Sequence, residues 1–505
     1  MGLLVGLIAK KDMDIFEPLD GMLVSMKKPV EARAIIGKNR GANSASAGSQ
    51  IVMAREGCAG LGYLSSSHVP SDFQQPMEQF SYTLLFNGRL YPFEGTPDCY
   101  SVAEYLGPTP DDGVQLLLNE TNGAYALAVL QEDHLLLARD PMGVVPLYIG
   151  ENEDYIGVAS ERKALWSIGI ENPQSFPPGH VAKMMRSGVG FIPVRKIKQP
   201  ESLRLTEEEA VRNLQSLLYN AVDVRTRDLQ RIAVGFSGGL DSSLLACLAD
   251  ACGIEVNLIS IGIKGSKDLE DASEAAEKLG MAYFAESFDE EDVERSIDKA
   301  LMLVEEPDPL KLEVAIPIMW VAEKAAEMDH RVLFLGQGCD ELFGGYRKYV
   351  TEYIRRGANA AQSLMFEDVA GAYERNFERD VKVSSALDVE LRLPFADWDL
   401  VQFAISLPVH MKLPTEESGQ RKRILRTLAI SLGIPTTIVE RKKRAIQYST
   451  RVDRVLRKMA RSEGLSLTEF VRHRFQQVLV QLDLSPDLKR SENMRQNREG
   501  FSAAR

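Results

Sequence analysis

The chain has 505 residues, of which 45% are hydrophobic and 26% are charged, and its formal net charge is -13. A chain of this length and composition can bury the cores of roughly two to four domains, which excludes simple disorder. The acidic excess argues against a protein that coats nucleic acid. No run of 18 apolar residues predicts a membrane span, and the start MGLLVGLIAKKD lacks the basic region of a signal peptide. We therefore expect a cytoplasmic protein without nucleic-acid or membrane partners.

Residues 1–197 are predicted to form a β-rich domain with an antiparallel or layered arrangement. Short apolar or alternating runs, separated by Gly, Pro, Asn and Asp, indicate strands that are joined by turns. The predicted strands are 3–8, 82–86, 125–130, 135–138 and 155–158. Few long helical patterns interrupt them.

The pattern changes near residue 206, where a second domain, 206–484, is predicted to begin. Thr206 can cap a helix that runs to about residue 224, and Glu209 stands three positions later as the capping-box partner. Buried strands and helices alternate beyond this point, which is typical of a doubly wound parallel sheet. The predicted strands are 232–236, 256–263 and 332–335, the predicted helices are 269–279 and 316–328, residues 381–471 are mostly helical, and 485–505 form a polar tail.

The segment from Ser237 to Ser243 reads SGGLDSS and stands between a predicted strand and a predicted helix. Glycines allow a tight turn that brings backbone NH groups against an anion, serines add hydroxyl donors, and the helix N-terminus points at the same place. The carboxylate of Asp241 would repel phosphates unless a divalent cation lay between them. The segment therefore predicts a pyrophosphate site in which Asp241 is a candidate magnesium ligand.

The phosphate loop is not a Walker A motif, and no GxGxxG opens the following helix, which disfavours ordinary kinase and dinucleotide chemistry. It resembles the signature of the ATP pyrophosphatases, which cleave ATP to AMP and pyrophosphate while they activate a substrate oxygen. A second segment, 336–346, reads GQGCDELFGGY and is similar to the GEGxDExFGGY motif of the glutamine-dependent asparagine synthetases. Further matches to this family lie at 265–268, 390–397 and 441–443.

Residues 1–190 resemble the class II glutaminase domain of the same family, with matches at 87–88, 137–148, 159–165 and 177–179. The resemblance implies an α/β protein in two parts. The N-terminal part is expected to be an Ntn-hydrolase-like domain with α/β/β/α layers. The C-terminal part is expected to be an ATP-pyrophosphatase domain, whose doubly wound parallel sheet is like that of the adenine nucleotide alpha hydrolases.

The resemblance also implies a ligase that uses ATP and Mg²⁺. Aspartate would attack the α-phosphate to give β-aspartyl-AMP and pyrophosphate, and ammonia would then displace AMP to give asparagine. Asp241 and Asp340 would hold the magnesium ion. Lys443 would stabilise the transition state with its positive charge, although the run 441–444 can also be read as a solvated basic patch or a targeting run. The expected ATP-binding residues are Phe236, Ser237, Gly238, Gly239, Asp241, Ser242, Ser243, Ile261, Leu335 and Gly336.

The glutaminase part departs from its family in three places. The family needs a cysteine after the initiator methionine, and this chain has Gly2, which has no side chain to act as a nucleophile. The segment 62–65 lacks the arginine of HxRLS, and Arg89 replaces the glutamate of NGE. Asn87 and Gly88, the oxyanion element, and Asp98 persist. We therefore expect no glutamine hydrolysis, and free ammonia as the nitrogen source.

The synthetase part departs in two places. Gln337 replaces a glutamate, and an amide can orient ammonia but cannot accept its proton. Glu313 stands where the family carries an arginine for the substrate carboxylate, with Lys311 as a candidate substitute. Two other hypotheses therefore stay open: amidation or cyclisation of a different carboxylate, and a nucleotide-binding regulator without turnover. The sequence does not determine the oligomeric state, for which a homodimer is one option.

Overall fold

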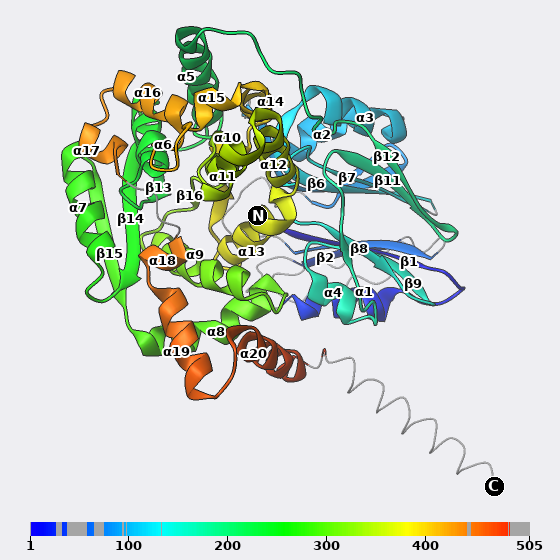
Figure 1. Cartoon of the computed structure of the whole chain (residues 1–505). Coiled ribbons are helices and arrows are strands. Elements are labelled where there is room, and N and C mark those ends of the chain that lie inside the picture. Colours follow the sequence, from blue (N-terminus) through cyan, green and yellow to red (C-terminus); the bar gives the residue numbers. More distant parts are fainter. Residues whose placement is uncertain are drawn as a thin grey trace.

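The computed structural model describes residues 2–26, 33–37, 58–64, 75–92, 95–96, 98–132, 134–441, 446–482 and 484. The predicted tail, 485–505, lies outside these residues. Figure 1 shows two halves side by side. The N-terminal half, in blue and cyan, contains two stacked sheets, and the C-terminal half is built around one parallel sheet.

Within the described residues, the N-terminal half has two six-stranded antiparallel sheets. In spatial order, one sheet consists of β10 (Gln174–Ser175), β8 (Tyr148–Glu151), β9 (Tyr155–Ala159), β1 (Leu3–Ala9), β3 (Ala59–Leu64) and β2 (Arg33–Gly37). The other consists of β12 (Gly188–Pro193), β11 (His180–Met185), β7 (His134–Arg139), β6 (Asn122–Gln131), β5 (Tyr82–Tyr91) and β4 (Met77–Gln79).

The facing surfaces of the two sheets share one apolar core, because alternate side chains of each strand point inward. Leu4 and Leu61 of the first sheet are buried there with Leu85 and Leu137 of the second. Two helices, α1 (Phe16–Ser25) and α4 (Arg162–Trp166), cover the outer surface of the first sheet, and α2 (Asp98–Leu106) and α3 (Pro110–Glu120) cover the second. The expected α/β/β/α layering is thus confirmed.

The C-terminal half contains a five-stranded parallel sheet, again within the described residues. Its spatial order is β15 (Ala282–Phe288), β14 (Glu255–Ile263), β13 (Arg231–Gly235), β16 (Val332–Phe334) and β17 (Glu390–Arg392). The chain moves outward from β13 to β15 and then returns to the other side of β13. The strand order therefore reverses between β13 and β16, and ligands of such sheets bind at this switch point.

Helices cover both faces of the parallel sheet. α6 (Leu240–Ala251) and α7 (Lys267–Leu279) contact β14, and α9 (Pro309–Glu327) contacts β14 and β16. The remaining elements are α5 (Glu207–Asp223), α8 (Glu290–Val304), α10 (Cys339–Phe343), α11 (Arg347–Arg356), α12 (Ala358–Ala370), the π-helical turn η2 (Tyr373–Phe377), α13 (Glu378–Ser385), the 3₁₀ turn η3 (Pro394–Ala396), α14 (Trp398–Ser406), α15 (Val409–Lys412), α16 (Arg423–Ser431), α17 (Thr436–Val439), α18 (Ile446–Ser449), α19 (Val452–Ser462) and α20 (Leu467–Gln481).

Two helix starts illustrate how local chemistry sets the elements. The capping box of α5 forms as predicted, because the Thr206 hydroxyl accepts the backbone NH of Glu209 at 3.2 Å. The helix predicted to begin at residue 316 begins earlier, at Pro309. The Asp308 carboxylate caps it by accepting the backbone NH of Lys311 at 3.0 Å, and proline is favoured in the first turn.

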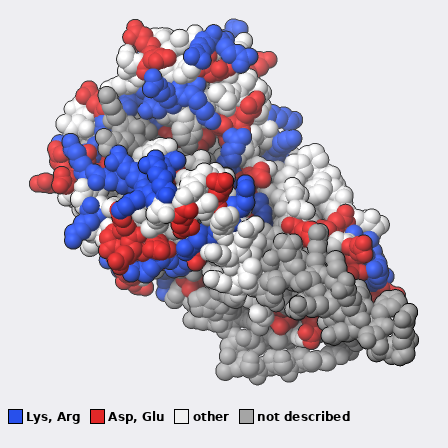
Figure 2. Space-filling model, turned by 60° about the horizontal axis from the view of Figure 1, so that its bottom comes forward, with Lys and Arg blue, Asp and Glu red and all other residues white. Residues whose placement is uncertain are grey.

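The surface charges are mixed on the face that α8, α19 and α20 form at the bottom of Figure 1. Figure 2 shows Lys and Arg side chains there beside Asp and Glu side chains. Lys458 of α19, for example, lies 2.6 Å from Glu290 of α8. Among the described residues, no helix has the length and apolar character that are needed to cross a membrane.

Candidate active site

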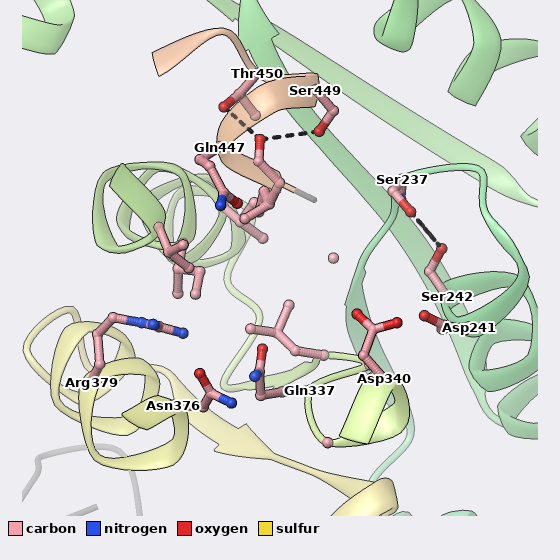
Figure 3. Close-up of a pocket in the computed structure, with 18 of the residues that line it drawn as sticks. Ser237, Asp241, Ser242, Gln337, Asp340, Asn376, Arg379, Gln447, Ser449 and Thr450 are labelled. Carbon is pink, nitrogen blue, oxygen red and sulfur yellow. Dashed lines mark hydrogen bonds between the residues drawn. The ribbon is translucent and has the colours of Figure 1, made fainter. Parts of the chain in front are cut away.

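The predicted phosphate loop lies between the end of β13 and the start of α6 (Figure 3). Gly238 has a positive φ of +64°, and a Cβ atom there would lie 2.9 Å from Ala272 Cα. The hydroxyl oxygens of Ser237 and Ser242 are 3.3 Å apart, across the turn. Only glycine fits this tight bend against α7, and the bend aims the N-terminus of α6 at the cavity.

The second motif follows β16, the neighbour of β13, so both loops emerge at the switch point of the sheet. Asp340 lies in the first turn of the short helix α10. A Cβ atom at Gly345 would lie 1.8 Å from Asp340 Oδ1, so the second glycine of GGY is needed for the carboxylate to lie where it does. In Figure 3, Asp340 and Asp241 face the same side of the cavity as Ser237 and Ser242.

Lys422, which the sequence analysis did not single out, joins the two acids. Its Nζ atom lies 2.6 Å from Asp241 Oδ2 and 2.6 Å from Asp340 Oδ1. Burial lowers the pKa of Lys422, but the two carboxylates outweigh burial and raise the pKa well above its usual value. Carboxylate oxygens beside a phosphate loop are ligands that Mg²⁺ prefers, so the donor chemistry fits a magnesium ion that accompanies a nucleotide.

A cavity of about 660 Å³ connects these loops with a second group of polar side chains. Most of the expected ATP-binding residues line it, namely Phe236, Ser237, Asp241, Ser242, Ile261, Leu335 and Gly336. Gly238, Gly239 and Ser243 are not among the lining residues, and Ser243 is fully buried. The cavity therefore brings together predicted site residues that follow β13, lie in β14 and follow β16.

The other end of the cavity, which we call the acceptor end, is lined by Lys311, Gln337, Lys348, Arg375, Asn376 and Arg379. In Figure 3, Arg379, Asn376 and Gln337 lie across the cavity from the serines of the phosphate loop. Asp368 also lines this end, but its carboxylate pairs with Lys348, accepts the Tyr349 hydroxyl at 2.5 Å and lies 2.5 Å from Arg375. Arg379 is likewise paired, with Asp380 at 2.7 Å. The end therefore offers an anionic substrate cationic and amide donors that neighbouring carboxylates hold in place.

Glu313 does not lie at the acceptor end, although the resemblance predicted it in the place of a substrate-binding arginine. It is buried, is not among the residues that line the cavity, and lies 3.4 Å from Arg457. Burial raises the pKa of Glu313, and Arg457 partly offsets this rise. Lys311, the candidate substitute, lines the cavity and lies 2.7 Å from Glu306.

Lys443 lies outside the described residues, so its predicted role remains a prediction. Its neighbour Arg441 is described and supports the phosphate loop. The guanidinium donates to the backbone oxygen of Gly238 at 2.9 Å and to that of Asp271 at 2.8 Å. At least one member of the basic run is therefore engaged with the loop and is not simply solvated.

The described residues that the resemblance assigned to a glutamine site are packed against other side chains of the protein. A Cβ atom at Gly2 would lie 2.1 Å from the hydroxyl oxygen of Tyr63, which is buried. Arg89 lies 3.5 Å from Asp98 and 3.2 Å from Glu390 of β17, so its guanidinium links the two halves. Burial raises the pKa of Asp98 to about 6, although Arg89 lowers it. Asn87, at the oxyanion element, is buried as well.

Gly88 has a backbone conformation that only glycine adopts readily. Its φ is +132°, and a Cβ atom there would lie 2.0 Å from the backbone oxygen of Ala124. A residue with a side chain would therefore not fit at position 88 without a shift of the neighbouring strand.

Comparison with known proteins agrees with this architecture. Residues 213–367 and 354–498 match the family model of asparagine synthase, and residues 65–167 match that of the glutamine amidotransferase domain. A protein named as glutamine-hydrolysing asparagine synthetase 1 in Methanocaldococcus jannaschii is 31% identical over 77% of this chain and 82% of its own length. The glutamine-hydrolysing asparagine synthetase of Brassica oleracea is 27% identical over 73% of this chain and 67% of its own length.

Among solved structures, the allosteric regulatory enzyme of purine biosynthesis covers 57% of this chain and 80% of its own at 16% identity, with a TM-score of 0.34. The family matches, the parallel sheet and the layered N-terminal half together define a carbon–nitrogen ligase with an Ntn-type amidotransferase domain and an ATP-pyrophosphatase-like domain. The chain belongs to the asparagine synthetase family. That family uses ATP.

Proposed function

We propose that the protein amidates aspartate with free ammonia and converts ATP to AMP and pyrophosphate through a β-aspartyl-AMP intermediate. The observation that carries this proposal is the single cavity that holds the phosphate loop and the acid pair at one end and the cationic acceptor end at the other. A carboxylate is a poor acceptor for ammonia because its leaving group would be oxide. Adenylation supplies AMP as the leaving group and so removes this barrier, and one cavity can hold both reactants in place.

Each group of residues has a proposed task. Backbone NH groups of the loop and the hydroxyls of Ser237 and Ser242 would hold the pyrophosphate, and Lys443 would balance charge on the reacting phosphorus. Phe236, Ile261, Leu335 and Gly336 would line the adenosine site. Asp241 and Asp340 would hold Mg²⁺, which would offset the charge of the leaving pyrophosphate when bound. Gln337 would orient ammonia through its amide.

Free ammonia is the proposed nitrogen source because Gly2 offers no nucleophile and the space beside it is taken. Tyr63 occupies the space beside Gly2, where a nucleophilic side chain would have to lie. Arg89 replaces the glutamate whose charge would meet the amino group of glutamine, and it lies 3.5 Å from Asp98. The proposal further includes a cytoplasmic location and leaves a homodimer as the assembly to test.

A second candidate differs only in the acceptor, which would be a different carboxylic acid. The position of Glu313 favours it, because this residue is turned away from the cavity and paired with Arg457. The family's arginine for the substrate carboxylate therefore has no counterpart at that position. Arg379, which lines the acceptor end from a different helix, would then bind the acceptor in another orientation.

The test is product analysis by mass spectrometry on mixtures of ATP, Mg²⁺, ammonium and a carboxylic acid. We expect asparagine and AMP from aspartate, and no product when glutamine replaces ammonium. Asp340→Asn should reduce pyrophosphate release by about 100-fold or more, since it removes a charge needed in the transition state. Asp250→Asn, at the exposed far end of α6, is the matched control and should have no effect. Product from glutamine, or from another acid only, would contradict the proposal as stated.

A further inference from the structure

The N-terminal half contacts the segment that leads into the acceptor end of the cavity. This segment, 305–308, connects α8 to α9. The carboxylate of Glu305 accepts the backbone NH groups of Arg162 at 2.9 Å and Lys163 at 3.0 Å, at the start of α4. It also accepts Nζ of Lys382, from α13, at 2.9 Å. Glu305 is therefore a buried junction among three elements, one of which belongs to the N-terminal half.

The next residue, Glu306, connects the N-terminal half with a residue that lines the cavity. Its Oε1 atom accepts Nη1 of Arg162 at 2.6 Å, and both of its carboxylate oxygens accept Nζ of Lys311 at 2.7 Å. Burial raises the pKa of Glu306, but Arg162 and Lys311 outweigh burial and lower it. The guanidinium of Arg162 is itself held, 4.2 Å from the centroid of the Tyr148 ring. Arg162 thus fixes the carboxylate that fixes Lys311.

A second connection reaches the other wall of the acceptor end. Glu378, the first residue of α13, precedes Arg379, which lines the cavity. Its carboxylate accepts the Tyr148 hydroxyl at 2.8 Å, Nη2 of Arg139 at 3.1 Å and the hydroxyl of Ser175, all from the N-terminal half. Arg139 is fully buried. The helical turn that carries Arg379 is therefore held from behind by the N-terminal half.

We propose that the N-terminal half, in place of supplying ammonia, positions the cationic side chains that bind the acceptor carboxylate. Arg162 acts through Glu306 on Lys311. Tyr148 and Arg139 act through Glu378 on the helical turn that carries Arg379. These three are positioning residues, because none of them lines the cavity. The inference rests on the proposed function, since it assumes that an anionic acceptor binds at this end. It explains why an α/β/β/α domain that lacks a nucleophile at position 2 still has a role.

The positions of the contacts give the proposal its specificity. The two connections described above end at Lys311 and at the helical turn that carries Arg379, and both of these side chains line the acceptor end. The phosphate loop is supported instead by Arg441 and Lys422 of the C-terminal half. Loss of a connection should therefore affect binding of the acceptor more than binding of ATP, because small displacements of substrate-binding groups affect only the substrate they bind.

The kinetic test compares Arg162→Gln with Arg162→Lys and with Arg195→Gln as a matched control. Arg195 also connects the two halves, because its guanidinium lies 4.6 Å from the centroid of the Trp398 ring. Arg195 and Trp398 do not line the cavity. We expect Arg162→Gln to raise the KM for the acceptor about tenfold and to leave the KM for ATP unchanged. Arg162→Lys should recover most of this loss, and Arg195→Gln should change neither constant. Equal rises in both KM values for Arg162→Gln would overturn the proposal.

A second readout does not depend on turnover. Hydrogen exchange over residues 308–314 should become faster in Arg162→Gln and stay unchanged in Arg195→Gln, and unchanged exchange in both would overturn the proposal. If the wild-type protein releases no pyrophosphate with any acid, the proposed function fails. Hydrogen exchange still decides whether the N-terminal half holds this segment.

Tyr148→Phe replaces Arg162→Gln as the test variant if Arg162→Gln does not fold, because it removes only one hydroxyl. It should raise the KM for the acceptor about threefold, and an unchanged KM would count against the inference.

Discussion

The ammonium group of Lys422 lies 2.6 Å from Asp241, although the two residues are 181 positions apart in the chain. Lys422 itself has a positive φ of 57° just before α16 begins, a conformation that is uncommon for a residue with a side chain. The same ammonium group contacts Asp340. One cation of the protein therefore holds together the two acids that follow neighbouring strands.

Replacing Lys422 by methionine should leave two buried carboxylates beside one another without a cation. Removing one partner of a buried ion pair typically lowers the free energy of unfolding by about 3 kcal/mol or more. Millimolar Mg²⁺ should restore part of this loss if the two acids bind the ion, and it should affect the wild-type protein less. The measurement is urea-induced unfolding with and without Mg²⁺.

The control for this experiment is Lys458→Met, which breaks an exposed ion pair with Glu290. Exposed pairs contribute at most about 1 kcal/mol, and no Mg²⁺ response is expected there. An identical Mg²⁺ response in Lys422→Met and in the wild-type protein would exclude the acid pair as a magnesium site.

Placing a cysteine at position 2 should not give the protein glutaminase activity. In Gly2→Cys, the new Cβ atom would lie 2.1 Å from the Tyr63 hydroxyl oxygen, so the ring would have to move. Overpacking of this kind costs about 1–3 kcal/mol, which denaturant unfolding would measure. We expect no glutamate release from glutamine by Gly2→Cys, and none by Gly2→Cys combined with Tyr63→Ala, because Arg89 still lies beside Asp98. Glutamate release by the single variant would show that the site is not blocked.

The parts of the site that could be predicted from the sequence are those with local signals. The strand, the glycine bend and the helix around Ser237 are adjacent in the chain, and the capping box of Thr206 spans four residues. Even the meeting of Asp241 with Asp340 follows from a general rule, because the ends of parallel strands beside a switch point face the same cleft.

The parts that could not be predicted depend on side chains that meet only in the folded chain. Lys422 lies in a stretch of several basic residues, and nothing local distinguishes it from its neighbours. Tyr63 fills the space beside Gly2 because β3 pairs with β1, and the register of that pairing is set by packing. Glu313 is turned away from the cavity because α9 begins at Pro309 and Arg457 of α19 provides its partner.

Lys412 should give the protein an unusual pH dependence of stability. Burial lowers the pKa of Lys412 to about 7, and Glu341 lines the same small cavity. The unfolded chain keeps the proton of this lysine up to about pH 10, whereas the folded protein releases it above about pH 7. The unfolded state thus binds more protons in this window, and stability should rise with pH by about 1 kcal/mol per unit.

Lys412→Met should remove this rise and should stabilise the protein near pH 7, where the lysine would otherwise have to lose its proton or stay charged in the core. The measurement is the free energy of unfolding in urea at pH 7, 8 and 9, taken as the difference between variant and wild type. Taking this difference cancels the pH-dependent contributions of the titratable groups that both proteins share. A difference that does not change with pH would mean that Lys412 does not release its proton in this range.

Gln337 allows the role of the ammonia-orienting residue to be tested directly. It lines the acceptor end, and an amide at this position can orient ammonia but cannot accept its proton. A carboxylate placed there could act as a general base, and such bases typically accelerate proton transfer by about 100-fold or more when their geometry is good. Because the site is not arranged around a carboxylate, we expect Gln337→Glu to raise the kcat with ammonium about tenfold.

The pH profile distinguishes a base from a change in binding. In Gln337→Glu, kcat should fall at low pH as the new carboxyl group takes up a proton, and this limb should be absent from the wild-type profile. The matched control is Asn376→Asp, which also turns a cavity amide into an acid. The Asn376 amide donates to Glu341 at 2.9 Å. Asn376→Asp would therefore place two carboxylates against each other, and it should lower kcat. If both variants respond alike, the added charge alone is responsible, and the proton of ammonia leaves by a route that does not involve position 337.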